Sequence, residues 1–202
     1  MLKSNMKKHP KIVSTQYEIH PLLLDRWSAR SFSTKPIHIE TLNHLFEAAS
    51  WAASSMNEQP WRFVFGAKDS ELFSLLYSTL AGGNQVWAKE AQVLIAVIAN
   101  THFPDGSMNL HAWHDVGAAS TYLLLQAAEL GILGHQMGGF NRETAESLLK
   151  IPNNCNIVSI IALGYRDSHE LLPEPFKTRE ITPRTRKPIH AFVFDSLDKL
   201  SL

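Results

Sequence analysis

The chain contains very little cysteine. Cys155 stands alone among 202 residues, so an intramolecular disulfide framework is excluded and cysteine by itself cannot build a thiolate metal site. Chains with so little cysteine are typical of reducing compartments, because disulfides form and persist under oxidising conditions. We therefore expect a cytoplasmic location.

Long apolar runs and an excess of charge are also missing. The longest apolar run, residues 93–99, is far shorter than the roughly 20 residues that a membrane-spanning helix needs. No apolar stretch follows the lysines of residues 1–11, so we expect neither a signal peptide nor a membrane anchor. The formal net charge is zero, and nothing in the overall balance favours nucleic acid or an anionic membrane surface.

Signatures of three other kinds of site are absent or incomplete. There is no Gly-x-Ser-x-Gly elbow of a serine hydrolase and no Gly-x-Gly-x-x-Gly turn of a nicotinamide-binding Rossmann domain. His111, His114 and Asp115 could meet on one face of a helix. A metal site needs further ligands and supporting contacts, so we interpret these residues as a polar helix surface and expect no metal.

What is present indicates one globular domain. The chain is 45% hydrophobic and 19% charged, which suits a single core over residues 1–202, with a leader at 1–15 and a C-terminal extension at 190–202. Apolar spacing predicts helices at 40–53, 70–80, 110–130 and 141–150, and strands at 61–65, 91–99 and 157–163. We expect an α+β fold with a central, largely antiparallel sheet flanked by helices.

Glycine and proline mark the expected ends of these elements. Gly82 and Gly83 are expected to end the second helix, and Gly131 is expected to cap the long one. Beyond Gly164 the chain is polar and rich in proline, with no periodic segment. The apolar residues 191–194 then need a cover that one chain does not obviously supply.

The motif Arg26-x-Ser28-x-Arg30 is the first candidate for chemistry. An extended backbone points all three side chains to one face. Two forked guanidinium groups and a hydroxyl suit a phosphate dianion, because charge-assisted hydrogen bonds are roughly twice as strong as neutral ones. Taken alone, the motif is more typical of a solvated surface run.

Three further segments offer polar groups. Asn57 and Gln59 precede Pro60, and their amides match the alternating donors and acceptors of a planar heterocycle; a plain polar loop is the alternative. Gly138 and Gly139 leave the backbone bare for a ligand, unless they form an ordinary tight turn. Arg184-Thr185-Arg186-Lys187 is a second basic cluster, or an exposed tail.

Together, in this order, the four segments resemble the nitroreductase family of FMN-dependent oxidoreductases. The resemblance covers about residues 22–189 and is most specific in Arg-x-Ser-x-Arg and Asn-x-Gln-Pro-Trp. It implies a set of residues that hold FMN. These are Arg26, Trp27, Ser28, Arg30, Asn57, Gln59, Gln136, Met137, Gly138, Gly139, Arg184, Arg186 and Lys187.

The resemblance also implies a role for each part of this set. Arg26, Ser28 and Arg30 would hold the phosphate and the nearby polar edge of the flavin, and Arg184 and Arg186 would close on the same phosphate. Asn57 would bond the pyrimidine side of the flavin, and the N–H groups of Gly138 and Gly139 would face flavin N5. NAD(P)H would act as a transient electron donor, and nitroaromatics, quinones or similar small molecules as acceptors. No side chain would act as a catalytic nucleophile, since the flavin carries the chemistry.

Family members are typically intertwined homodimers with FMN at the subunit interface. The second arginine cluster could therefore come from either chain. Two departures from the family pattern are Gly138, where many members carry a polar side chain, and the short loop 100–109, where others carry an insertion. Alternatives to this function are an FMN-storage or FMN-sensing protein without turnover, and another flavin reaction such as dehalogenation, enone reduction or flavin cleavage.

Overall fold

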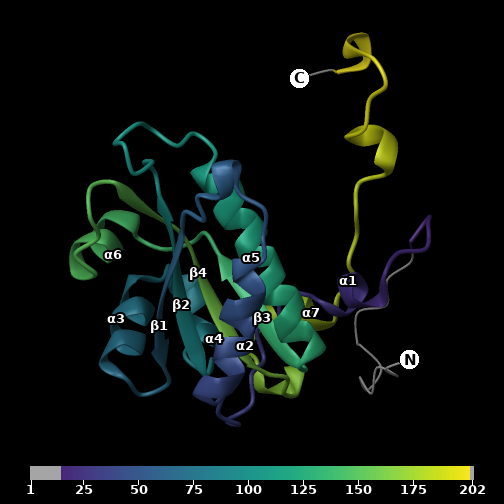
Figure 1. Ribbon diagram of the computed structural model, residues 1–202. Helices are drawn as coiled ribbons and strands as arrows, with labels where there is room; N and C mark the ends of the chain where they lie inside the picture. Colours follow the sequence, from purple (N-terminus) through teal and green to yellow (C-terminus); the bar gives the residue numbers. More distant parts are fainter. Residues whose placement is uncertain (1–14, 201–202) are drawn as a thin grey trace.

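The computed structural model describes residues 15–200, so the predicted leader lies almost wholly outside the described residues. Its sheet has four antiparallel strands in the order β1-β2-β4-β3 (Figure 1). The strands are β1 (Trp61–Ala67), β2 (Val93–Asn100), β3 (Ile132–Met137) and β4 (Cys155–Tyr165). The helices of the described residues are α1 (Pro21–Asp25), α2 (Ile39–Ser50), α3 (Glu71–Thr79), α4 (Gly82–Ala88), α5 (Ala112–Glu129), α6 (Arg142–Leu148) and α7 (Phe176–Ile181). This confirms the predicted α+β class with an antiparallel sheet.

Helices cover both faces of the sheet, and the central strand β2 is buried on both sides. Leu94, Ala96 and Ile98 pack into a core with residues of α3, α4 and α6. The alternate residues of the strand, from Val93 to Ala99, pack into a second core with α2 and α5. Each fully buried Val, Leu or Ile side chain contributes roughly 1.5–3 kcal/mol. The continuous apolar pattern of residues 93–99 follows from this double burial.

Three helix ends carry residues that stabilise them. Ser70 precedes α3, and its Oγ accepts the Phe73 N–H at 3.1 Å. Asn141 caps α6 in the same way, accepting the Thr144 N–H at 3.0 Å. Gly131 follows α5 with φ of 71°, a left-handed conformation that glycine adopts without a steric cost.

One expectation about the elements was wrong, and two elements were not predicted. Gly82 and Gly83 do not stop a helix: α3 ends earlier, and the two glycines begin α4, whose Trp87 is buried. The glycine-rich segment after Gly131 is strand β3, which gains its hydrogen bonds by pairing with β4. The proline-rich tail also contains a helix, α7.

The C-terminal segment leaves the body of the molecule. Figure 1 shows it in yellow, running away from the sheet after α7. Phe192 and Val193 are 59% and 56% exposed, and Phe194 is 38% exposed. One chain therefore leaves this predicted apolar segment uncovered.

Candidate functional site

The motif at residues 26–30 is extended and alternates between inside and outside. Trp27 and Ala29 are buried in the core, whereas Arg26, Ser28 and Arg30 are partly exposed. Arg26 follows α1 with an extended backbone. The three polar residues therefore share a face, as predicted, and Trp27 can offer a ligand little besides its backbone.

The second arginine cluster lies against this motif within the same chain. Arg184 donates from Nη1 to the carbonyl oxygen of Arg26 at 2.8 Å, and from Nη2 to the carbonyl oxygen of Leu24. A contribution from a partner chain is thus not needed to bring the two clusters together. The physical reason is the turn of the tail through α7, which the sequence pattern did not reveal.

Positive charges lie close together where the clusters meet. Burial and the neighbouring Arg186 lower the pKa of Arg26. Burial, Arg186 and Arg26 lower the pKa of Arg184, while Asp25 raises it. Within residues 15–200, none of these three arginines has a carboxylate within ion-pair distance. Like charges held together in this way favour an anion between them.

A buried donor points to the same conclusion. Arg184 Nε is buried and has no hydrogen-bond partner among the described residues. A buried unpaired donor costs about 1–3 kcal/mol, more when it is charged, so such groups usually meet a ligand or water. Lys187 follows on the exposed side of the cluster.

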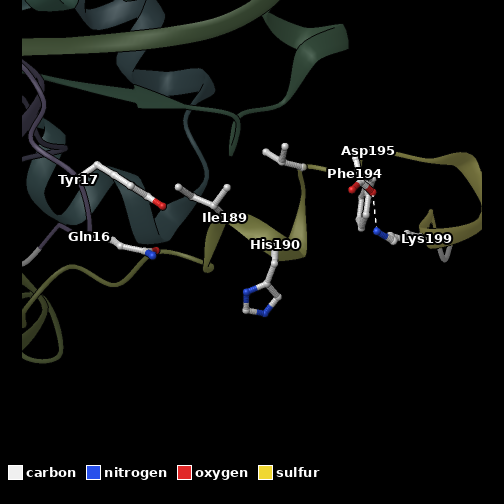
Figure 2. A pocket seen from close by; sticks show the side chains of 8 residues that line it. Gln16, Tyr17, Ile189, His190, Phe194, Asp195 and Lys199 are labelled. Atoms are coloured by element: carbon white, nitrogen blue, oxygen red, sulfur yellow. Dashed lines mark hydrogen bonds and ion pairs between the residues drawn. The ribbon is translucent and has the colours of Figure 1, made fainter.

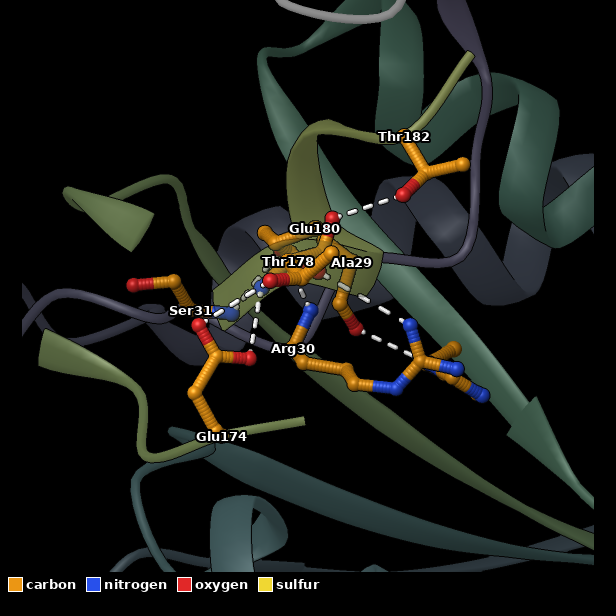
Figure 3. Close-up of polar contacts among 8 residues, drawn as sticks. Ala29, Arg30, Ser31, Glu174, Thr178, Glu180 and Thr182 are labelled. Atoms are coloured by element: carbon orange, nitrogen blue, oxygen red, sulfur yellow. Dashed lines mark hydrogen bonds and ion pairs between the residues drawn. The ribbon is translucent and has the colours of Figure 1, made fainter. Parts of the chain in front are cut away.

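Arg30 has a different environment, because a carboxylate from α7 faces it. Glu180 accepts the backbone N–H of Arg30 at 2.8 Å and that of Ser31 at 3.1 Å (Figure 3). Arg30 Nη1 lies 3.8 Å from the second carboxylate oxygen. Nothing in the local sequence distinguishes Glu180 from the other acidic residues of the tail, so its role was not predicted.

The turn that holds Asn57 and Gln59 is strained and firmly anchored. Met56, Asn57 and Gln59 have φ of 55°, 56° and 52°, a region that costs non-glycine residues of the order of 1–3 kcal/mol each. The buried carboxylate of Asp115 accepts the Ser55 N–H at 2.9 Å. Strain that tertiary contacts maintain is typical of functional sites.

This turn does not reach the arginines within one chain. Its hydrogen bonds run to Asp115, to Arg62 and between its own residues. In the part of the chain that the structure describes, no polar contact joins Asn57 or Gln59 to Arg26, Ser28 or Arg30. The structure therefore leaves two predicted parts of the site apart.

The glycine segment offers free backbone donors. In residues 15–200, the N–H groups of Gly138 and Gly139 donate to no backbone acceptor. A Cβ on Gly138 would meet nothing within 4 Å, so its backbone is open to a ligand. Gln136 donates from Nε2 to Ser159 Oγ at 2.9 Å, whereas the side chain of Met137 is buried. Met137 can therefore contribute little beyond its backbone.

Two hollows lie between the N-terminal and C-terminal segments. The larger, of about 1150 Å³, is bounded by parts of residues 15–24 and 183–192, and Arg184, Arg186 and Lys187 line its polar side. Figure 2 shows the smaller, of about 660 Å³, where Tyr17 approaches Ile189. Both hollows are walled by the N-terminal and C-terminal segments, and one chain leaves their apolar side chains open.

The rival site at His111, His114 and Asp115 has a structural explanation. His114 Nδ1 lies 3.1 Å from Asp115 Oδ1, and the other Asp115 oxygen anchors the turn at Ser55. Among residues 15–200, no group of three or more His, Cys, Asp or Glu side chains is arranged to hold a metal. Within the same range, no helix combines the length and the apolar character needed to cross a membrane.

Comparisons with known proteins agree with one another. The model of the Nitroreductase family matches residues 23–72 and 66–165. A protein of Archaeoglobus fulgidus, provisionally named NADH dehydrogenase/NAD(P)H nitroreductase, is 30% identical over 148 residues, covering 71% of this chain and 83% of the relative. A crystal structure described as an oxidoreductase containing FMN is 36% identical with a TM-score of 0.87, covering 94% of this chain and 96% of the other.

A more distant structure supports the fold alone. A nitroreductase of Desulfovibrio desulfuricans, also provisionally named, was solved in complex with FMN. It is 20% identical with a TM-score of 0.71, covering 89% of this chain and 98% of the other.

Proposed function

The chain belongs to the nitroreductase family, and from this premise we propose that it is an FMN-dependent oxidoreductase that passes electrons from NAD(P)H to small oxidised substrates, such as nitroaromatics or quinones. The observation that carries the proposal is the cluster of Arg26, Arg184 and Arg186. Three guanidinium groups without a carboxylate partner in residues 15–200 need an anion. A phosphate ester supplies it.

The residues of the cluster fit a phosphate. Arg184 keeps a buried, unpaired Nε donor, and the hydroxyl of Ser28 lies on the same face as Arg26. Lys187 adds a positive charge on the exposed side. In this proposal these side chains hold the phosphate of FMN, and the fixed geometry of Arg184 against the Arg26 carbonyl keeps the donors in place before binding.

Other groups suit the ring system. The N–H groups of Gly138 and Gly139 donate to no backbone acceptor in residues 15–200, and the space beside Gly138 is open. The amides of Asn57 and Gln59 offer both donors and acceptors. When bound, FMN would supply the redox chemistry that carries electrons from NAD(P)H to the acceptor. The protein's own residues bind, orient and expose the cofactor, and no side-chain nucleophile is needed.

We further propose that the working protein is a homodimer whose sites are shared between subunits. Two observations support this. The turn with Asn57 makes no contact with the arginines inside one chain, and Phe192 to Phe194 remain uncovered. A second copy supplies both the missing turn and the apolar cover.

The phosphate assignment is tested by the double variant Arg26→Ala with Arg186→Ala. We expect it to fold but to purify largely free of FMN. The control is Lys89→Ala with Lys199→Ala, which removes the same charge away from the cluster. Flavin occupancy is measured from the ratio of flavin to protein absorbance. Full occupancy in the Arg26→Ala, Arg186→Ala variant would contradict the assignment.

Sharing between subunits is tested by mixing two defective variants. Asn57→Ala damages the turn, and the arginine double variant damages the phosphate cluster. If the parts come from different chains, a mixed dimer has one intact site and one doubly damaged site. Refolding the variants together should then restore FMN binding in part, whereas sites within single chains would give no restoration.

A further inference from the structure

Glu180 of α7 is a buried acid that the proposed binding set does not include. Its side chain is almost fully inside the protein, with 3% of the residue exposed. One carboxylate oxygen, Oε1, accepts the backbone N–H groups of both Arg30 and Ser31, at 2.8 and 3.1 Å. These bonds fix α7 against residues that lie about 150 positions earlier in the chain.

The second oxygen of Glu180 is committed to Arg30. Oε2 is buried, has no hydrogen bond among the described residues, and lies 3.8 Å from Arg30 Nη1. Figure 3 shows the two side chains approaching from separate segments. A buried carboxylate without a cation nearby is costly, so this oxygen needs the guanidinium close by.

Pairing makes Arg30 unlike the other arginines of the site. Arg26, Arg184 and Arg186 have no carboxylate within ion-pair distance in residues 15–200, and burial together with the charges of Arg186 and Arg26 lowers the pKa of Arg184. Arg30 is partly neutralised by Glu180 but keeps its N–H donors, because 3.8 Å is too long for a hydrogen bond. A neutralised donor suits an uncharged acceptor better than a phosphate dianion.

We propose that Glu180 is a positioning residue that acts through Arg30. It directs the Arg30 donors to an uncharged acceptor of the flavin and, through the backbone of residues 30–31, fixes the helix that precedes Arg184 and Arg186. This inference rests on the proposed FMN function. It starts from a division of the arginines in which Arg26, Arg184 and Arg186 hold the phosphate and Arg30 faces the polar edge of the flavin that the resemblance implies. The new element is the role of Glu180.

Binding of FMN and of riboflavin, which lacks the phosphate, separates these roles. In Glu180→Gln the amide oxygen still accepts the two backbone N–H groups, but the negative charge is gone. We expect affinity for both flavins to fall about fivefold, the size of effect that one polar contact produces. Arg26→Ala should lower the affinity for FMN much more than the affinity for riboflavin. Flavin fluorescence quenching measures both.

A double-mutant cycle tests whether Glu180 acts through Arg30. In an Arg30→Met background, Glu180→Gln should have no further effect on either flavin, because the partner is already gone. The control Glu170→Gln changes an exposed acid of the same segment and should leave both affinities unchanged. Glu180→Ala should in addition lower the melting temperature, since two backbone donors lose their acceptor.

Each result is decisive. Wild-type affinity for both flavins in Glu180→Gln overturns the inference, and so does a fivefold loss that persists in the Arg30→Met background. If Glu180→Gln loses FMN binding while its riboflavin binding is unchanged, the division of the arginines is overturned. If the wild-type chain binds neither flavin, the proposed function fails together with the inference.

Discussion

Arg184→Ala removes the side chain that joins the C-terminal segment to the start of the N-terminal motif. Arg184 donates to the carbonyl oxygens of Leu24 and Arg26. A hydrogen bond from a charged group contributes about 1.5–3 kcal/mol, so two independent, buried bonds would contribute about 3–6 kcal/mol. Partial exposure and repulsion from Arg186 reduce this sum, and we expect a net loss of about 1–2 kcal/mol.

A loss of this size is measurable by thermal unfolding. For a domain of about 200 residues, 1 kcal/mol corresponds to about 2–4 °C, so the melting temperature without FMN should fall by about 2–8 °C. With saturating FMN the difference in melting temperature between the variant and the wild type should widen. The variant also loses donors to the phosphate, so FMN stabilises it less. Arg184→Lys should lie between the two, since lysine cannot reach both carbonyls as a planar fork.

A matched control is Arg142→Ala, which removes an exposed arginine that packs on the ring of Trp113. It should melt like the wild type with and without FMN, apart from a small change from the lost ring contact. The reasoning is refuted if Arg184→Ala melts at the wild-type temperature and is stabilised by FMN to the same extent as the wild type.

Three further predictions concern other parts of the molecule. Asp115→Ala leaves the Ser55 N–H without its acceptor and should lower the free energy of unfolding by about 2 kcal/mol, measured in urea. Gly66→Ala places a Cβ 2.2 Å from the backbone nitrogen of Phe73, and overpacking against backbone should cost about 3 kcal/mol. Burial raises the pKa of Cys155, so its thiol should react slowly with a disulfide reagent at neutral pH and faster as the pH rises.

Each of these has a control. Asp105→Ala alters an exposed acid that bonds only locally to Ser107 and should leave the urea midpoint unchanged. Gly82→Ala adds a Cβ with nothing within 4 Å and should fold normally. For the thiol, the urea-unfolded chain should react at the rate of an ordinary cysteine; equal rates in folded and unfolded protein would contradict the prediction.

Elements with strong local signals could be predicted from the sequence. The apolar run at 93–99 became β2 because both faces of that strand are buried. The end of α5 at Gly131 followed from the left-handed conformation that glycine adopts readily. In both cases the residues that decide the structure are neighbours in the chain.

Elements that depend on distant packing could not be predicted. Strand β3, which contains Gly134, was not among the predicted strands. A Cβ at that position would lie 2.2 Å from a methyl group of Leu124 in α5, so the glycine permits close packing of helix and strand. Gly82 likewise begins α4 because the buried Trp87 anchors that helix. Neither reason is visible in a local pattern.

The residues of the candidate site also fall into those that the local sequence predicts and those that depend on distant contacts. The charges and spacing of Arg26, Ser28 and Arg30 predicted a shared face, which the alternating burial confirms. That Arg184 meets Arg26 depends on a contact between residues 158 positions apart. Glu180 could not be singled out at all, because its role exists only once α7 packs against Arg30.

The central claim is that the protein uses FMN to move electrons from NAD(P)H to a small acceptor. The most direct measurement is the visible spectrum of the FMN-loaded protein without air, before and after addition of NADPH or NADH. The account predicts that the yellow absorbance bleaches and returns when a nitroaromatic or quinone is added. A bound flavin that stays yellow with both donors would contradict it and would indicate a protein that stores or senses FMN.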